Sequence, residues 1–341
     1  MSGFALWIRE RQSTLFAYAL TAALFIVGVI HSSGFASGSS IRQMLVFASF
    51  VGFAALGQTL VILAGGLDLS VPWLMGFGGV ELSRLSASGV PAGVAIVIVI
   101  AIGVGIGLLN GVGVTWLRVA PIVMTLAMGG LIQAYLLGVG ELQSSGDTVP
   151  SVAVDLASNR AGPIPVIAIV WFVVALAAGV VISRTAFGRR IHAAGDNEVV
   201  ARLSGIRVDR VRLATYAISG AASTFGGIVL AGYVGTTYLE IGAPYLFTSI
   251  AAVVIGGASI LGGRGTYWGT VAGALTLTVL SALLPLFQLS TADLDIVYGV
   301  VILVGVWLSS SGHTALASLW ERSRKAPDPG LAPTGGSDDS S

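Results

Sequence analysis

The sequence predicts an all-α, polytopic bundle of about ten transmembrane helices, and three observations support this fold class. Of the 341 residues, 55% are hydrophobic and only 10% are charged, whereas soluble domains carry about 25% charged residues. The mean hydropathy is +0.91. Glycine occurs 47 times, which is typical of membrane helices that pack closely through small residues. We therefore expect lipid to surround most of the surface.

Ten apolar stretches approach the roughly 20 residues that cross a bilayer as a helix. The third is weakened by Glu81 and Arg84, and another division of residues 90–142 gives nine or eleven spans. The first is expected to be a retained helix, because its apolar run is long and no small-x-small cleavage site follows it. The ten stretches lie near residues 14–33, 43–64, 71–88, 91–116, 121–141, 164–183, 213–232, 246–262, 267–287 and 295–311.

The basic residues predict the orientation. With both termini in the cytoplasm, the inner side holds fourteen of the seventeen Lys and Arg residues, seven of them from Arg184 to Arg212. This positive-inside bias favours an even number of spans. We expect a cytoplasmic N-terminus over residues 1–13 and a membrane domain over 14–311 with a cytoplasmic loop at 184–212. The remaining residues, 312–341, include a stretch rich in Pro, Gly and Ser and are expected to form a disordered cytoplasmic tail.

Several kinds of chemistry find no support in the sequence. The chain has no cysteine, and His31, His192 and His313 are too far apart in sequence to indicate a metal site. No paired carboxylates or nucleophile-plus-base arrangement predicts a catalytic residue. The G-x-x-x-x-G-K-[ST] motif for ATP is missing. A net charge of +1 gives no indication of a nucleic-acid partner. We therefore expect neither an enzyme nor a directly bound cofactor.

One stretch, residues 57–72, interrupts an apolar run with polar residues. It reads GQTLVILAGGLDLSVP, in which Gly65 and Gly66 precede Asp68 and Ser70. Non-helical backbone at membrane depth survives only against protein or a water-filled cavity, and an ionisable residue there is a functional candidate. The alternative is structural: the glycine pair ends one helix and Asp68 or Ser70 caps the next, with Pro72 in its first turn. The two roles are compatible.

A partial echo of this pattern follows at residues 255–265, which read IGGASILGGRG. Paired interrupted segments in two parts of a transporter chain indicate an internal pseudo-repeat beside a pathway. The inner loop, 184–212, has a different pattern, because a turn at 195–197 precedes Val199, Val200, Leu203 and Ile206 at near-helical spacing. This short helix is expected to rest on lipid headgroups or to dock into a groove of another protein.

These segments carry a family resemblance. The chain resembles the permease subunits of ATP-binding-cassette importers for monosaccharides such as ribose, galactose, arabinose and xylose. The resemblance covers residues 40–310 and rests on GQTLVILAGGLDLSV, PIVMTL, FGRRIHAAGDNEVVARLSGIRVDRV and VIGGASILGGRGTYWGTVAGAL, in that order. One departure is Val71-Pro72-Trp73, where the family usually has glycine and small residues. This departure is expected to affect the local start of the helix and the size of the solute.

The resemblance implies the partners. A separate ATPase subunit would use ATP and Mg and would grip the inner loop, while a periplasmic or lipoprotein solute-binding protein would meet the acidic outer loops. A second permease copy or a paralogue would complete the dimer. The implied function is import of a small sugar across the cell (inner) membrane. The implied ATPase-coupling residues are Gly195, Asp196, Asn197, Ala201, Arg202, Leu203, Ser204 and Gly205.

Sparse charge within the membrane suits a neutral solute that crosses cavities lined by amide and hydroxyl groups. Alternative solutes in the same superfamily are nucleosides, branched-chain amino acids or a signalling sugar. An ion-coupled secondary transporter is less favoured, because it needs acidic groups in the membrane to carry the ion and only Asp68 is expected to lie deep. The candidates for the translocation pathway, which are also candidates for interhelical hydrogen bonds, are Gln58, Asp68, Ser70, Asn110, Thr125, Gln133 and Tyr135.

Overall fold

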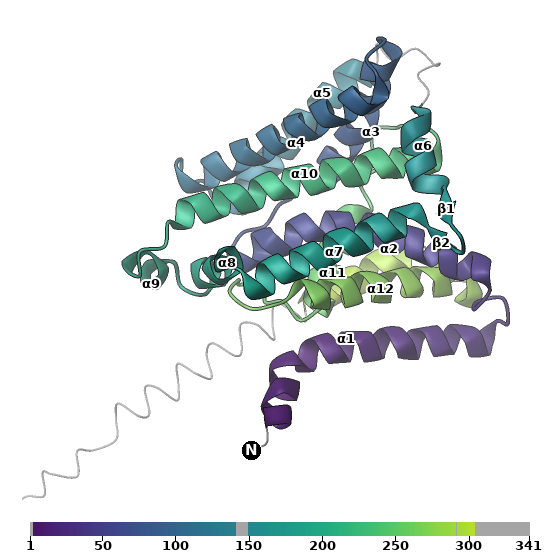
Figure 1. Ribbon diagram of the computed structural model, residues 1–341, viewed down its shortest axis with the longest axis horizontal. Coiled ribbons are helices and arrows are strands. Elements are labelled where there is room, and N and C mark those ends of the chain that lie inside the picture. Colours follow the sequence, from purple (N-terminus) through teal and green to yellow (C-terminus); the bar gives the residue numbers. More distant parts are fainter. Residues whose placement is uncertain (1–2, 141–148, 291, 304–341) are drawn as a thin grey trace, which may run out of the picture.

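The computed structural model describes residues 3–140, 149–290 and 292–303, which form an all-α bundle with one short hairpin (Figure 1). Residues 292–303 form a helix after the last labelled element. The other elements are, in order, α1 (Gly3–His31), α2 (Gly38–Leu63), α3 (Val71–Ala87), α4 (Ala92–Thr115), α5 (Pro121–Gly140), α6 (Ser151–Ser158), β1 (Arg160–Ala161), β2 (Ile164–Pro165), α7 (Val166–Arg184), α8 (Ala186–Asp196), α9 (Glu198–Leu203), α10 (Val208–Val234), α11 (Tyr245–Ile255), α12 (Tyr267–Leu283) and η1 (Leu284–Phe287).

The predicted fold class is confirmed. A helix lies in each of the ten stretches expected to span the membrane, but the helix in the eighth stretch ends at Ile255 and residues 256–262 form a loop. Residues 304–311 of the last stretch, Glu141 at the end of the fifth, and the tail 312–341 lie outside the described residues. Seven of the described helices are long and apolar enough to cross a membrane, in α1, α2, α4, α5, α7, α10 and α12. Helices α3 and α11 are shorter, with 17 and 11 residues. The sequence did not indicate α6, α8 or the β1–β2 hairpin.

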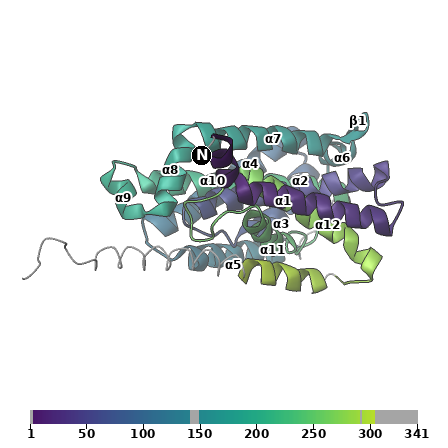
Figure 2. The ribbon, with the colours of Figure 1, turned by 90° about the horizontal axis from the view of Figure 1, so that it is seen from below.

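Helices α2 and α10 form the centre of the bundle. Helix α10 packs most extensively against α4, α3 and α2, and α2 also packs against α12, α11 and α7. Figure 2 shows α1 on the outside, along α12, where Thr21 and Thr276 share a hydrogen bond of 2.7 Å. Helix α4 is apolar on all sides and exposes Val97 and Leu109. A helix of this kind is stable where lipid covers its outer face.

The contact between α4 and α10 depends on glycine. A Cβ atom at Gly107 would overlap the backbone carbonyl of Tyr216, and one at Gly220 would overlap the carbonyl of Gly103. Small residues at a crossing let two membrane helices approach until their backbones touch, which maximises van der Waals contact in the absence of a hydrophobic driving force. This close crossing holds α10 beside the interrupted segment that follows α2.

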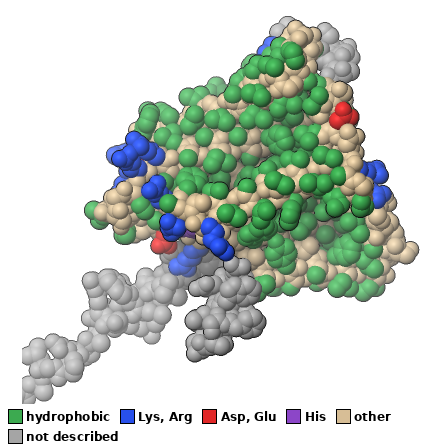
Figure 3. Space-filling view, viewed as in Figure 1, with side chains coloured by type: hydrophobic (Ala, Val, Ile, Leu, Met, Phe, Trp, Pro, Cys, Tyr) green, Lys and Arg blue, Asp and Glu red, His purple; other side chains and the backbone are tan. Residues whose placement is uncertain are grey.

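The charged side chains gather at the ends of the bundle. Figure 3 shows a broad hydrophobic band across one face and a group of Lys and Arg side chains at the end where α8 and α9 lie. We call this the α9 end. The α4–α5 connection and the loop between α11 and α12 also lie toward it, whereas α6 and the α1–α2 connection lie at the opposite end (Figure 1). Most of the arginines of the described residues therefore lie at the α9 end. The opposite end has fewer, among them Arg42, Arg84 and Arg160.

Candidate functional site

Residues 64–70 form a non-helical loop between α2 and α3, as the sequence predicts, and Ala64, Asp68 and Ser70 are its buried residues. Ala64 is the C-cap of α2, and Gly65 follows with a φ of 81°, a conformation that glycine adopts without steric penalty. Ser70 occupies the N-cap position of α3, with a proline in the first turn. The Ser70 side chain makes no capping hydrogen bond. The loop therefore depends on other groups for its polar contacts.

Asp68 provides one set of these contacts. Its side chain is fully buried and accepts hydrogen bonds from the Ser70 backbone N–H at 3.0 Å and from the Ser70 hydroxyl. The Ser219 hydroxyl, in the middle third of α10, donates to the second carboxylate oxygen at 2.7 Å. The Asn110 amide of α4 donates to the Ser70 hydroxyl oxygen at 2.9 Å. Asp68 thus joins α3, α4 and α10 through neutral donors, and no salt bridge reaches it from residues 12–138, 149–290 or 292–303.

Side chains from α5 and α10 bind the loop backbone. Thr125 accepts a hydrogen bond from the Leu69 N–H at 3.0 Å, and the Tyr216 hydroxyl donates to the Leu67 carbonyl at 3.2 Å. Arg212 donates through Nε to the Ala64 carbonyl at 3.4 Å. Buried backbone groups outside regular structure need such partners. The sequence did not indicate a role for Arg212, Tyr216 and Ser219, which lie on one face of α10 at spacings of three and four residues.

The predicted pathway residues divide into two groups. Asp68, Ser70, Asn110 and Thr125 come together around the loop. Tyr135 instead donates to Glu81 at 2.7 Å, and Gln133 is half-buried elsewhere on α5. Both polar atoms of the buried Gln58 side chain have no hydrogen-bond partner among the described residues. The hydrogen bonds in this part of the chain therefore join four of the seven candidates and leave three apart.

The predicted helix in the inner loop is α9. The Asn197 side chain accepts from the Val200 N–H at 3.1 Å, so Asn197 is its N-cap, as expected from the turn at 195–197. Ser204 is the C-cap, and Gly205 follows with a φ of 80°, the left-handed conformation that glycine commonly adopts just after a helix. Ala201 is buried. Ile206 lies after the helix and packs against the core.

Helix α9 lies at one extremity of the bundle (Figure 1) and exposes apolar side chains there. Val199, Val200 and Leu203 are exposed by 66%, 56% and 84%. We call these three side chains the α9 surface. Three adjacent apolar side chains on a protruding helix, at the end of the bundle that carries most of the charge, are typical of a binding surface.

Ion pairs anchor α9 to α10. The Arg202 guanidinium binds both the Glu198 carboxylate, at 2.9 Å, and the Asp209 carboxylate, while Arg212 binds Glu198 at 2.8 Å. Burial alone would raise the pKa of Glu198, but its contacts with Arg202 and Arg212 outweigh this effect and lower the pKa. The guanidinium of Arg202 thus donates through Nε and both terminal nitrogens to carboxylates of its own chain. Arg212 connects α9 to the loop after α2, because it also donates to Ala64.

Three backbone segments meet at Gly195, which lies near the end of α8. A Cβ atom at Gly195 would overlap the Leu63 carbonyl oxygen and approach the backbone nitrogen of Gly263. The Gly263 N–H donates to the Leu63 carbonyl at 3.1 Å, and His192 forms a 2.9 Å hydrogen bond with the Gly263 carbonyl. We call this contact of α8 with the loops at 64–70 and 256–266 the glycine junction. It brings the two echoed glycine segments together, which their sequence similarity alone did not predict.

The remaining predicted coupling residue, Asp196, lies beside this junction. Its backbone is adjacent to Gly263, and it lines a shallow cleft with Gly195, Gly262 and Arg264. The predicted coupling residues therefore fall into two sets. Gly195 and Asp196 contact the body of the bundle, whereas Asn197, Ala201, Arg202, Leu203, Ser204 and Gly205 build and terminate α9.

The apolar helices, the buried polar loop and the exposed tip define a multi-pass membrane protein of the permease class. Residues 40–306 match the family described as branched-chain amino acid transport system / permease component, and the chain belongs to this family. No solved structure matches the chain.

Curated relatives cover most of the chain. It is 34% identical over 292 residues to the ribose import permease protein RbsC of Bacillus subtilis (strain 168), covering 84% of this chain and 88% of the relative. It is 32% identical over 301 residues to the autoinducer 2 import system permease protein LsrC of Yersinia enterocolitica, covering 87% and 82%. The LsrC protein of Escherichia coli (strain K12 / DH10B) is 31% identical over 331 residues, covering 95% and 96%.

Proposed function

We propose that this chain is the membrane-spanning permease subunit of an ATP-binding-cassette importer in the cell (inner) membrane and that its solute is a small sugar. The α9 surface carries the proposal, because its exposed apolar side chains suit the groove of a partner subunit. Similarity to relatives named for import of ribose and of autoinducer 2 favours a sugar. The family description, which names branched-chain amino acids, keeps that solute class as the alternative.

The partner that docks on the α9 surface is a separate ATPase subunit. It uses the ATP and Mg, and this chain contributes no ATPase site of its own. Movement of α9 would reach the membrane helices by two routes. In the first, Glu198 binds Arg212, whose guanidinium donates to the Ala64 carbonyl at the end of α2. In the second, α8 contacts both loops at the glycine junction. In this proposal Arg202 acts by fixing α9 to α10 through Glu198 and Asp209.

The buried loop would be the element that responds to this movement. Asp68, Ser70, Asn110 and Thr125 hold it in the arrangement described here, and these bonds would exchange when the bundle opens. The Gln58 side chain supports this exchange of hydrogen bonds. A buried amide without a hydrogen-bond partner is unfavourable unless a second conformation of the bundle or a water molecule provides one. Gln133 and Tyr135 would contribute to the pathway nearer the opposite end of α5.

Other partners follow from the orientation. With the α9 end in the cytoplasm, both termini would also lie there, and Asp155, Glu240 and Asp293 would face outward with Asp147, which lies outside the described residues. These acidic side chains suit a solute-binding protein or lipoprotein. A second copy of this chain, or a paralogue, would complete the pathway, as expected for subunits that move together when two ATPases close.

Reconstitution tests the function directly. The chain, its ATPase and its binding protein are placed in proteoliposomes, and ATP-driven import is measured for pentoses, hexoses, autoinducer 2, nucleosides and branched-chain amino acids. We expect import of one sugar and stimulation of ATP hydrolysis by that sugar. Stimulation only by an amino acid or a nucleoside would replace the sugar assignment. Uptake without the ATPase that collapses with an ionophore would identify a secondary transporter instead.

A further inference from the structure

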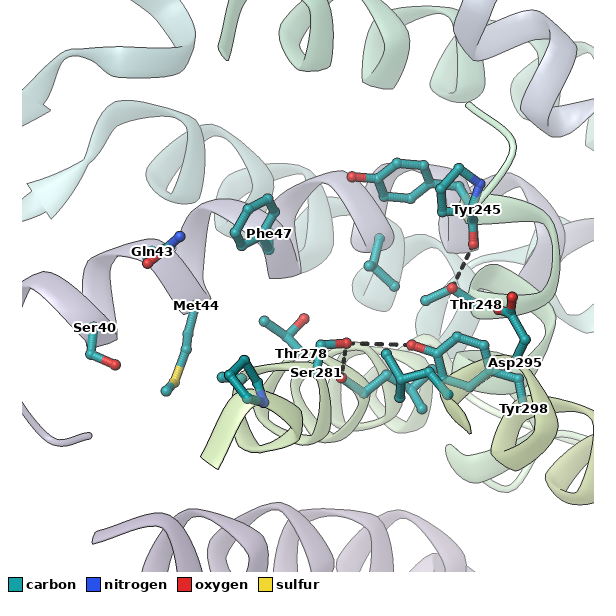
Figure 4. A pocket seen from close by; sticks show the side chains of 16 residues that line it. Ser40, Gln43, Met44, Phe47, Tyr245, Thr248, Thr278, Ser281, Asp295 and Tyr298 are labelled. Carbon is teal, nitrogen blue, oxygen red and sulfur yellow. Dashed lines mark hydrogen bonds between the residues drawn. The ribbon is translucent and has the colours of Figure 1, made fainter. Parts of the chain in front are cut away.

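A cavity of about 450 Å³ lies between α2, α11, α12 and the helix at 292–303 (Figure 4). None of the residues predicted for the pathway lines it. Its volume falls within the range of about 300–1,000 Å³ that is usual for small-molecule sites. It is lined by Ser40, Gln43, Met44, Phe47, Val51, Pro244, Tyr245, Thr248, Leu277, Thr278, Ser281, Ala282, Pro285, Leu294, Asp295 and Tyr298.

The cavity extends from the surface into the bundle. Gln43 and Asp295 are exposed at its rim, whereas Thr248, Thr278 and Tyr298 are buried by more than nine-tenths. The lining part of α2, from Ser40 to Val51, corresponds to about 16 Å at 1.5 Å per residue. The cavity is therefore deep enough to admit a small molecule from the end opposite α9 toward the middle of the membrane.

Hydroxyl groups in the wall are set to accept hydrogen bonds. Thr278 donates its proton to the Ala274 carbonyl at 2.8 Å, Ser281 to the Leu277 carbonyl at 2.9 Å and Thr248 to the Pro244 carbonyl at 2.6 Å. A hydroxyl oxygen has two lone pairs, which remain available after its proton is used. The Ser281 oxygen already uses one lone pair to accept a hydrogen bond from the Tyr298 hydroxyl at 3.4 Å. The lone pairs that remain on the three oxygens favour a ligand that brings its own O–H donors.

The facing wall adds amide and phenol groups. Figure 4 shows Gln43, Phe47 and Tyr245 on one side of the cavity and Thr278, Ser281 and Tyr298 on the other. The Gln43 amide and the Tyr245 hydroxyl make no hydrogen bond to any described residue, so they can both donate to and accept from a ligand. The aromatic rings supply apolar surface for the C–H groups of the same ligand.

The charge of the wall limits the ligand class. Among the residues that the structure describes, no Lys, Arg or His lines the cavity, and the one carboxylate in its lining is Asp295 at the rim. A phosphate or carboxylate would have no positive partner there, and a free amino acid would leave its carboxylate unpaired in a largely apolar site, which is unfavourable. A neutral solute with several hydroxyl groups satisfies the wall.

We propose that the cavity between α2, α11, α12 and residues 292–303 is the site at which the permease holds a neutral, polyhydroxylated solute during import. This assignment rests on the proposed sugar importer. Helix α11 connects the site to the glycine junction, since it runs from Tyr245 in the cavity wall to Ile255, just before the loop that contains Gly262 and Gly263. Displacement of that loop would therefore move one wall of the site.

Cysteine protection tests the site, because the natural chain contains no cysteine. Ser281→Cys places a thiol in the cavity, and Ser151→Cys places a control thiol on the exposed start of α6. Both variants are labelled in outward-oriented membrane vesicles with a charged methanethiosulfonate reagent. We expect D-ribose, or the sugar that the reconstituted complex imports, to slow labelling of Ser281→Cys at least threefold and to leave Ser151→Cys unchanged.

Transport by matched variants gives a second readout. Thr278→Trp, which fills the cavity, should reduce import at least tenfold while ATP hydrolysis without solute is retained. Val97→Trp, at an exposed position of α4, should import normally. Gln43→Ala removes an exposed side chain and should reduce import severalfold without loss of protein from the membrane, so the test does not depend on Thr278→Trp alone.

The outcomes separate the two proposals. A wild-type complex that imports no sugar overturns the proposed function, and this assignment fails with it. If the wild-type complex imports sugar, the proposed function stands and the cavity assignment is tested alone. That assignment is overturned if Ser281→Cys is never labelled or is not protected by sugar, or if Thr278→Trp and Gln43→Ala both import normally. A third outcome is that Ser281→Cys reacts in detergent but not in the lipid membrane, and that sugar has no effect on the rate. This result would identify a lipid acyl chain as the occupant of the cavity and would also overturn the assignment.

Discussion

Ser219 in α10 donates a 2.7 Å hydrogen bond to the buried carboxylate of Asp68, which lies 151 residues earlier in the chain. This bond ties the interrupted segment after α2 to the middle of α10, the helix that begins just after α9. A carboxylate buried without a cation depends on each of its donors, because each unsatisfied buried polar group carries a desolvation penalty.

The first prediction concerns this bond. Ser219→Ala leaves one Asp68 oxygen without its donor and should destabilise the protein by about 1–3 kcal/mol. Thermal unfolding of the purified protein in detergent measures the effect as a lower Tm. Ser49→Ala is the matched control, because Ser49 is also fully buried but donates only to the Leu45 carbonyl in its own helix. Equal Tm values for the two variants would contradict the assigned role of Ser219.

The second prediction concerns the α9 surface. Leu203→Arg should weaken binding of the ATPase subunit at least tenfold, because it places a charge in the centre of an apolar contact. The Tm should stay the same, since Leu203 is 84% exposed. Co-purification and ATP-driven import provide the measurements. Val152→Arg, which makes the same kind of change at an exposed position of α6 at the opposite end of the bundle, serves as the control for co-purification. An unchanged complex with Leu203→Arg would remove α9 from the docking surface.

The third prediction concerns the glycine junction. Gly195→Ala introduces a Cβ atom that overlaps the Leu63 carbonyl, so at least one backbone must shift. We expect reduced import and uncoupled ATP hydrolysis. Gly130→Ala in α5 is the control, because no atom lies within 4 Å of a Cβ there and replacing a helical glycine by alanine is stabilising by up to about 1 kcal/mol. Normal coupling in Gly195→Ala would show that the junction does not transmit movement.

The fourth prediction concerns the residues around α9. Arg202→Ala removes the bonds to Glu198 and Asp209, and Asp196→Ala alters the cleft beside Gly263. Gly205→Trp forces a large side chain into left-handed backbone at a φ of 80°, which is strained for any residue with a Cβ. Each change should uncouple ATP hydrolysis from transport while insertion into the membrane is retained. Normal uptake by all three variants would argue against this role.

The fifth prediction concerns pH. The pKa of Glu198 is lowered in the folded protein, so its ion pairs stabilise α9 fully above the ordinary glutamate pKa of about 4.3. This contribution is lost as the pH falls through the lowered value. Hydrogen exchange of residues 198–203, corrected for its intrinsic rate, should be constant from about pH 7 to 5 and rise below about pH 4. Glu198→Gln should exchange faster at neutral pH and respond less to acid.

The spans and α9 are predictable from sequence because their determinants are local. Apolar length identifies the membrane helices, and Asn197 and Gly205 mark the limits of α9 by their capping roles. Spacing also indicated that Asp68 follows a helix break. The partners of Asp68 and Gly195 were not predictable, because Ser219 and Gly263 are distant in sequence and a lone serine or glycine carries no pattern. The cavity was missed for the same reason, since its walls come from four separate segments.

Apart from the His192 ring, the contacts of the glycine junction are made by main-chain atoms, and main chain has no alternative rotamers. Contacts between long side chains can absorb a displacement of an ångström or so through small torsional changes, but a carbonyl held against an α-carbon has no such compliance. The end of α8 and the two loops must therefore shift as one piece or separate completely. A transporter with this linkage would change conformation between discrete states, since a small displacement of α8 would leave the loops in place and a larger one would shift them together.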